Sequence, residues 1–123
     1  MPAVEVLYYR EGSRVPVLEW LATLDLSSIA VCLDRLERLE AEGHELRRPG
    51  ADYLRDGIYE LRAKRRGINY RMLYFFQGRL AVVVSHGFVK QRARIPELEV
   101  ELAVTRKARF SRDPVGHTHR RGT

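Results

Sequence analysis

The chain has 123 residues, of which 45% are hydrophobic and 31% are charged. A chain of this length is expected to form one domain around one hydrophobic core, and its composition excludes a disordered or fibrous protein. It contains no apolar run approaching the roughly 20 residues of a membrane span, and its first residues lack a signal-peptide pattern. The single cysteine, Cys32, excludes an internal disulfide and a cysteine-based zinc site. We therefore expect a cytoplasmic protein with no membrane partner.

The positive charge is concentrated in the second part of the chain. The formal net charge is +6, but residues 1–50 carry 6 basic and 9 acidic side chains, whereas residues 51–123 carry 16 basic and 7 acidic ones. Only three of the 22 basic residues are lysines. Arginine offers a planar fork of donors that fits phosphate. An arginine-rich surface therefore indicates a nucleic-acid partner; the alternative, a genome-wide preference for arginine, would not spare the first 50 residues.

The first part of the chain predicts one strand and two helices. Residues 3–9 are rich in β-branched and aromatic side chains, as strands are. A proline suits the first turn of a short helix over residues 16–24. Ser27 or Ser28 is a candidate cap for a second helix that ends near Glu42. The apolar side chains of this helix recur at helical spacing and are predicted to lie in the core: Leu26, Ile29, Leu33, Leu36 and Leu39.

Strand-like patterns dominate the middle of the chain. Three strands are predicted over residues 58–65, 68–76 and 79–90. The pairs Arg66-Gly67 and Gln77-Gly78 separate them, and an X-Gly pair is a reasonable two-residue hairpin turn. We therefore expect two consecutive hairpins.

The last part of the chain predicts one more helix. It begins at Pro96 and ends near Phe110, with acidic residues at its start and basic residues at its end, an order that complements the helix dipole. Residues 1–110 are expected to form the single domain, and residues 111–123 a flexible basic tail. The predicted fold class is α+β, in the order β-α-α-β-β-β-α, with an antiparallel-rich sheet packed on helices.

Counting through two-residue turns predicts the register of the hairpins. Arg62 then faces Arg71, Arg71 faces Val84, and Asn69 faces His86. One face of the sheet is nearly all apolar and is predicted to pack on helices: Tyr59, Leu61, Ala63, Tyr70, Met72, Tyr74, Phe76, Ala81, Val83, Ser85 and Val89. The other face has an apolar end and a polar, basic end. The apolar end comprises Leu73, Phe75, Leu80 and Val82, and the basic end comprises Arg62, Lys64, Asn69, Arg71, His86 and Lys90.

The facing pair of arginines needs a physical explanation. Two like charges directly opposite on a sheet are destabilising. The pair Arg62 and Arg71 therefore requires a bound anion, an acidic partner such as Glu60, or water between them. The functional interpretation is a cradle for phosphate, and the alternative is two surface arginines spread apart in solvent.

Four short motifs between Leu54 and about Phe110 carry a family resemblance. They are Gly57-Ile58-Tyr59-Glu60-Leu61-Arg62, Tyr70-Arg71, His86-Gly87-Phe88-Val89-Lys90 and Ile95-Pro96. Together they resemble the RelE/ParE superfamily of toxins, specifically its phage-related HigB-like members. The order of the predicted elements also matches the compact RelE-like fold.

The resemblance implies a toxin of a type II toxin–antitoxin system. Such a toxin acts as a metal-independent, ribosome-dependent mRNA endonuclease (an mRNA interferase) that inhibits translation, without a cofactor. Its partners are mRNA on the ribosome and a helix-turn-helix antitoxin (HigA-like). Two alternatives remain open: a ParE-like, non-catalytic inhibitor of DNA gyrase, and a non-catalytic nucleic-acid-binding module.

The resemblance also suggests roles for individual residues. Arg62 and Arg71 match the inward-facing strand arginines of the family, and Lys90 matches the first basic residue of its Phe-x-Lys-Lys motif, whose second lysine is replaced here by Gln91. The implied reaction is attack of an RNA 2′-hydroxyl on the adjacent phosphate, which needs a base, an acid and cations on the transition state.

Candidate residues can be named for each task. The two arginines would hold the phosphate, and Lys90 would add charge or donate the leaving proton. His86 is the one side chain on that face expected to titrate near neutral pH, so it is either the base or a hydrogen-bonded structural histidine. The remaining polar residues nearby are candidates for RNA-binding contacts: Lys64, Arg65, Arg66, Asn69, Arg92 and Arg94.

Overall fold

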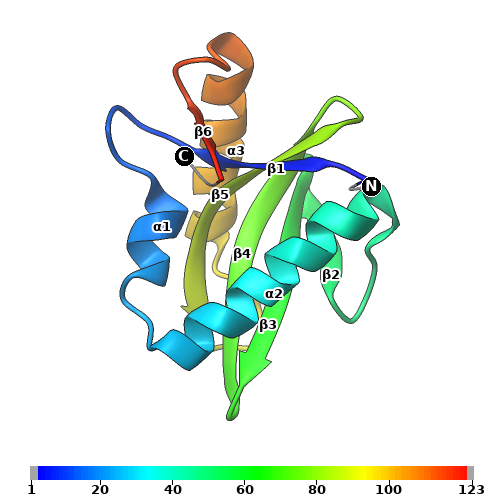
Figure 1. The fold of residues 1–123 in the computed structure, drawn as a ribbon, viewed down its shortest axis with the longest axis vertical. Coiled ribbons are helices and arrows are strands. Elements are labelled where there is room, and N and C mark those ends of the chain that lie inside the picture. The colour runs from blue at the N-terminus through cyan, green and yellow to red at the C-terminus, as the bar shows by residue number, and fades with distance from the viewer. Residues whose placement is uncertain (1–2, 122–123) are drawn as a thin grey trace.

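The computed structural model describes residues 3–121 and confirms the mixed α+β class. The described residues form one six-stranded sheet in the order β2-β3-β4-β5-β1-β6 (Figure 1). All pairs are antiparallel except β1 with β5, which run parallel. The elements in chain order are β1 (Glu5–Tyr9), α1 (Pro16–Leu21), α2 (Leu26–Glu42), the short 3-10 helix η1 (Gly43–Glu45), β2 (Ala51–Arg55), β3 (Ile58–Arg65), β4 (Ile68–Gln77), β5 (Ala81–Lys90), α3 (Glu97–Arg112) and β6 (Thr118–Arg120).

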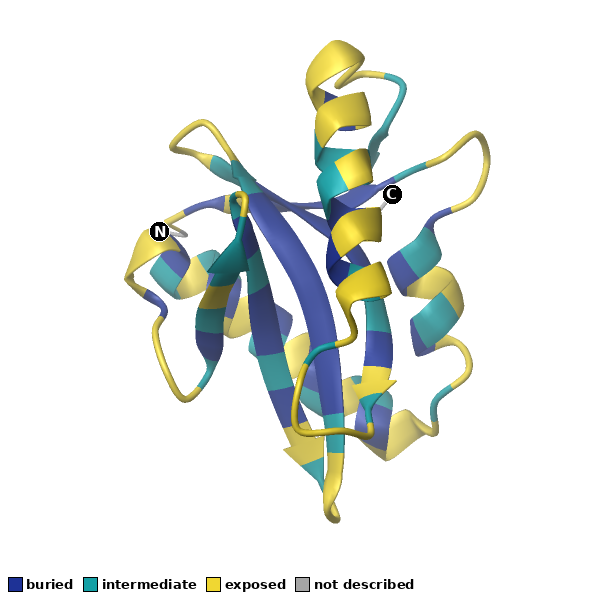
Figure 2. Ribbon diagram, turned by 180° about the vertical axis from the view of Figure 1, so that it is seen from behind, coloured by how far each residue is buried: buried dark blue, intermediate teal, exposed yellow. Residues whose placement is uncertain are grey.

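Helices cover both faces of the sheet. Side chains of α1 and α2, such as Val17 and Leu36, form one buried cluster with β-strand residues such as Met72. Side chains of α3, such as Phe110, form a second cluster with Phe75 on the opposite face. Figure 2 shows α3 crossing the sheet with its outer surface exposed. Within the described residues, no helix combines the length and the apolarity that a membrane crossing requires.

Helix α2 begins two or three residues earlier than the sequence predicts, and it turns different side chains towards the sheet. The cap is Asp25, whose carboxylate accepts a hydrogen bond from the backbone N–H of Ser28 at 2.7 Å, so the expectation of a cap at Ser27 or Ser28 is wrong. Ser28 is instead buried, and its hydroxyl shares a 2.8 Å hydrogen bond with the hydroxyl of Tyr70. Leu26, predicted to be in the core, is 85% exposed.

Strand β2 was absent from the predicted elements. Its sequence, Ala-Asp-Tyr-Leu-Arg, does not alternate cleanly between apolar and polar side chains. It pairs antiparallel with β3 through a turn at Asp56 and Gly57, both of which have positive φ angles. An Asp-Gly pair is among the strongest hairpin signals in a sequence, so the turn could have revealed this strand.

The register of the first predicted hairpin is confirmed. Arg62 lies opposite Arg71 on the paired strands β3 and β4. Both side chains therefore lie on the same face of the sheet, the face that α3 covers further along the strands.

The register of the second hairpin differs from the prediction. The connection between β4 and β5 has three residues rather than two, and Ser85 is an extra residue in β5, because Leu73 pairs with His86 whereas Tyr74 pairs with Val84. Arg71 therefore faces Phe88 rather than Val84, and Asn69 faces Lys90 rather than His86. This corrects the predicted faces on one side of the bulge: Val82 and Val84 pack towards α1 and α2, and Val83 packs towards α3.

The C-terminal segment contains secondary structure that the sequence analysis did not predict. Helix α3 continues to Arg112, and β6 pairs antiparallel with β1. The rings of His117 and His119 stack on those of Tyr9 and Tyr8, with centroids 5.0 and 6.2 Å apart. The sequence analysis expected no secondary structure over residues 111–123, whereas the structure places the end of α3 and the strand β6 there. Residues 122–123 of the predicted tail lie outside the described part of the chain.

A close contact between β5 and α1 gives a stability prediction. A Cβ atom added at Gly87 would lie 2.1 Å from Cε3 of Trp20, the only tryptophan in the sequence. We expect Gly87→Ala to lower the free energy of unfolding by about 2 kcal/mol, because overpacking displaces the indole. Urea unfolding followed by circular dichroism measures the loss. In a Trp20→Leu background the same glycine change should cost less than half as much; an equal cost would contradict the contact.

Candidate nucleic-acid interface

A basic pocket lies at the C-terminal end of strand β3, beyond the end of its partner strand β2. The pairing of β2 with β3 reaches only as far as Ala51 opposite Leu61, so the last residues of β3 extend beyond their partner strand. The cavity there has a volume of about 440 Å³. Seven of its lining residues are basic and two are acidic. The basic ones are Arg35, Arg38, Arg47, Arg48, Arg62, Lys64 and Arg71, and the acidic ones are Glu42 and Glu45.

The two facing arginines converge on one buried carboxylate. Nε of Arg62 donates to Oε1 of Glu60 at 2.6 Å, and Nε of Arg71 lies 3.7 Å from Oε2 of the same residue. Glu60 and Arg71 are buried, while Arg62 is partly exposed. Glu60 is thus the acidic partner that separates the two like charges. Burial lowers the pKa of Arg71, an effect that the charge of Glu60 opposes.

A second carboxylate extends this ion-pair chain towards solvent. Oδ2 of Asp52, on β2, lies 2.6 Å from Nη2 of Arg48 and 3.6 Å from Nη2 of Arg62. The hydrogen bonds from Arg48 are the main reason why the pKa of Asp52 is lowered. The resulting order is Arg48, Asp52, Arg62, Glu60, Arg71, and we call these five residues the arginine ladder. Its signs alternate and its formal charge is +1.

His86 lies beneath α3, away from the basic pocket. Its Nδ1 is 2.8 Å from Oγ of Ser85, and its Nε2 is 3.1 Å from Oε1 of Glu99 on α3. Burial, with a smaller contribution from Arg106, lowers its pKa to about 4. A general base must reach the proton that it removes. The geometry therefore favours the structural interpretation of His86 over the catalytic one.

The structure brings together some of the predicted site residues and separates others. Arg62, Lys64, Asn69 and Arg71 line the basic pocket. Lys90 pairs with Asn69 at the end of β5, and these two residues line a neighbouring cavity. The other predicted RNA-binding residues, all outside the lining of the basic pocket, are Arg65 and Arg66 at the β3–β4 turn, and Arg92 and Arg94 in the exposed segment between β5 and α3.

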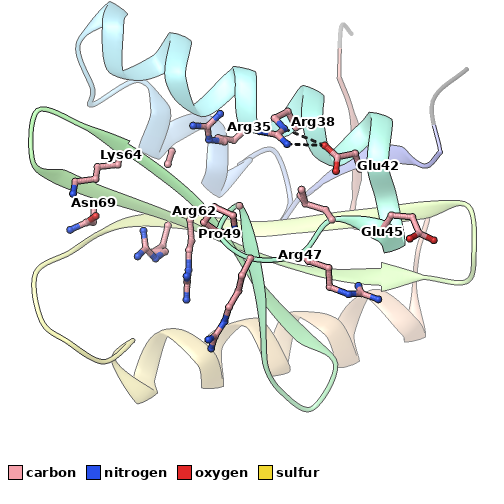
Figure 3. A pocket seen from close by; sticks show the side chains of 14 residues that line it. Arg35, Arg38, Glu42, Glu45, Arg47, Pro49, Arg62, Lys64 and Asn69 are labelled. Atoms are coloured by element: carbon pink, nitrogen blue, oxygen red, sulfur yellow. Dashed lines mark hydrogen bonds and ion pairs between the residues drawn. The ribbon is translucent and has the colours of Figure 1, made fainter.

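Sequence reasoning missed the part of the pocket that precedes β2. Arg35 and Arg38 lie along α2, and Figure 3 shows Arg62 extending from β3 away from that helix. Arg47 and Arg48 come from the segment that leads into β2. The adjacent arginines at positions 47 and 48 were a visible signal, but the acidic balance of residues 1–50 concealed it.

Comparison with known proteins identifies the family. A search of the curated proteins finds no match for this chain. The family model described as "Phage derived protein Gp49-like (DUF891)" matches residues 19–108, which include α2, all of β2 to β5 and most of α3. This match covers most of the chain and every residue that lines the basic pocket. The chain therefore belongs to the Gp49-like family of phage-derived proteins, a family commonly associated with RelE-type toxins.

Proposed function

We propose that this protein is the toxin of a type II toxin–antitoxin system, similar to HigB, and that it cleaves mRNA on the ribosome in the cytoplasm. The observation that carries the proposal is the basic pocket at the end of β3, which the facing pair Arg62 and Arg71 helps to line. Family membership supports the toxin-like character. A helix-turn-helix antitoxin is the proposed neutralising partner.

The proposed reaction is transfer of a phosphodiester within the RNA. The 2′-hydroxyl loses its proton to a solvent water molecule as its oxygen forms a bond to phosphorus. The bond from phosphorus to the 5′-oxygen breaks, and that oxygen takes up a proton. The products are a 2′,3′-cyclic phosphate and a free 5′-hydroxyl. Arg62, which is partly exposed, would contact the phosphate and stabilise the charge of the pentavalent transition state. Arg71 is buried and would act through Glu60 rather than on the substrate.

Lys90 is the proposed proton donor to the leaving 5′-oxygen. It lies opposite Asn69, on the same sheet face as the two arginines and at the rim of the neighbouring cavity. His86 has no catalytic role in this proposal, because its side chain is enclosed between Ser85 and Glu99.

One observation favours a second candidate function, a nucleic-acid-binding module without catalysis. Both arginines already have a carboxylate partner in Glu60. An anion that binds at Arg62 must compete with that partner, so the arginine favours reversible binding of a phosphate over the strong contact that stabilises a transition state.

Induced expression with mapping of mRNA 5′ ends tests the proposal. We expect growth arrest, cuts inside reading frames, and recovery when a helix-turn-helix antitoxin is co-expressed. Arg62→Gln should reduce the cuts by about a hundredfold, as loss of a transition-state donor does.

Arg14→Gln is the matched control for this experiment. Arg14 is also an ion-paired, exposed arginine, but it pairs with Glu19 on α1 and lies outside the pocket lining. The Arg14→Gln variant should produce as many cuts in mRNA as the wild type. Growth arrest with a DNA-damage response and no cuts would support the gyrase inhibitor instead. RNA binding without arrest or cuts would support the non-catalytic module.

A further inference from the structure

The inner end of the arginine ladder is buried and its outer end is exposed. The side chains of Arg71 and Glu60 are 8% and 4% exposed, those of Arg62 and Asp52 are 30% and 26% exposed, and that of Arg48 is 73% exposed. The ladder therefore runs from the interior of the sheet face to solvent. A large ligand approaching this edge meets the guanidinium of Arg48 first.

Arg48 retains donors for such a ligand. Its Nε and Nη2 both point to one oxygen, Oδ2 of Asp52, at 2.9 and 2.6 Å. Among residues 3–121, no partner is found for its Nη1. Arg62 approaches the same oxygen at 3.6 Å. Asp52 thus holds two guanidinium groups side by side, and the outer one can still donate hydrogen bonds.

The surroundings of Arg48 favour an anion over any other ligand. The pocket lining carries five more basic than acidic side chains. The ion pair of Arg48 with Asp52 lies at the surface, where solvent weakens such pairs and an incoming anion can replace the carboxylate. The fork of an arginine binds phosphate through two parallel bonds.

We propose that Arg48 binds a phosphate of the single-stranded RNA backbone next to the phosphate held by Arg62, with Asp52 as the positioning residue for both guanidinium groups. This inference rests on the proposed function and adds a binding residue to it. It gives a function to the segment before β2, which lines the pocket together with strands β3 and β4. Contacts to phosphate are independent of base sequence.

The salt dependence of RNA binding tests the proposal. A short single-stranded RNA of mixed sequence is titrated with the full-length protein at several salt concentrations. Arg48→Gln should weaken binding about tenfold at low salt, and it should reduce the slope of log affinity against log salt by about 0.7, which corresponds to one lost phosphate contact. Arg48→Lys should keep the slope, because it keeps the charge.

Arg14→Gln is the control for a simple loss of net charge. Arg14 is 75% exposed and lies 2.8 Å from Glu19, so it closely matches Arg48 in exposure and pairing. The Arg14→Gln variant should keep the wild-type slope of log affinity against log salt. Equal slopes for Arg48→Gln and Arg14→Gln would overturn the inference, even if the wild type cuts mRNA. A lower slope for Arg48→Gln alone would support it, even if no cuts are found and the proposed nuclease activity fails.

Discussion

Replacing Glu60 with glutamine is expected to lower the free energy of unfolding by about 3 kcal/mol, because it leaves a buried charge uncompensated. Oε2 of Glu60 and Nε of Arg71 are both buried, and neither has a hydrogen-bond partner among the described residues, so each depends on the charge of the other. The change would also leave Arg62 facing Arg71 without a carboxylate between them. Urea unfolding at neutral pH measures the effect.

Asp52→Asn provides the matched control for this prediction. It makes the same chemical change in the same ladder, but at a partly exposed position, so it should cost less than about 1 kcal/mol. The double variant Glu60→Gln, Arg71→Gln should recover about half of the loss, because no unpaired charge remains buried. Similar losses for Glu60→Gln and Asp52→Asn would show that Glu60 does not compensate a buried charge.

Acid should destabilise the protein through His86 by about 3 kcal/mol between pH 6.5 and pH 4. Burial, together with the charge of Arg106, holds the pKa of His86 down at about 4, below its ordinary value of 6.5. The unfolded chain therefore takes up a proton at a pH where the folded chain does not. This contribution to stability is complete above pH 6.5 and is lost as the pH falls through this window.

The groups that face His86 define the control experiment. Ser85 adjoins it on β5, and Glu99 and Arg106 face it from α3. Carboxylates elsewhere also titrate in acid, so the quantity to compare is the difference between wild type and His86→Gln at each pH. That difference should shrink towards pH 4. A constant difference would contradict the buried, neutral His86.

Local sequence patterns were sufficient to predict strand pairing where the register depends only on the turn between two strands. The arginine pair could be placed on one face of the sheet because a two-residue turn at Arg66-Gly67 determines the register of β3 and β4. The prediction failed where the turn at Gln77-Gly78 gained a residue and Ser85 became a bulge. A bulge is a response of the strand to its neighbours, so it leaves little trace in the sequence.

The predicted core of α2 is confirmed at Leu36 and Leu39 but wrong at Leu26 and Leu33, for a related reason. Leu26 and Leu33 have helical spacing with Leu36 and Leu39, but the helix is rotated so that Ser28 and Cys32 face the sheet. The buried hydrogen bond between Ser28 and Tyr70 joins residues far apart in the chain. Helical periodicity identifies an apolar stripe, whereas its exact orientation depends on the partner surface.

By itself the sequence determined the mixed fold class, the order of most elements, the excess of arginine and the facing positions of Arg62 and Arg71, because these depend on composition, local periodicity and one short turn. Only the tertiary structure decided that Glu60 lies between those arginines and that Arg48 and Asp52 join them. It also enclosed His86 beneath α3. Those relations depend on which distant segments pack together and on how much water they exclude, and both are properties of the folded chain.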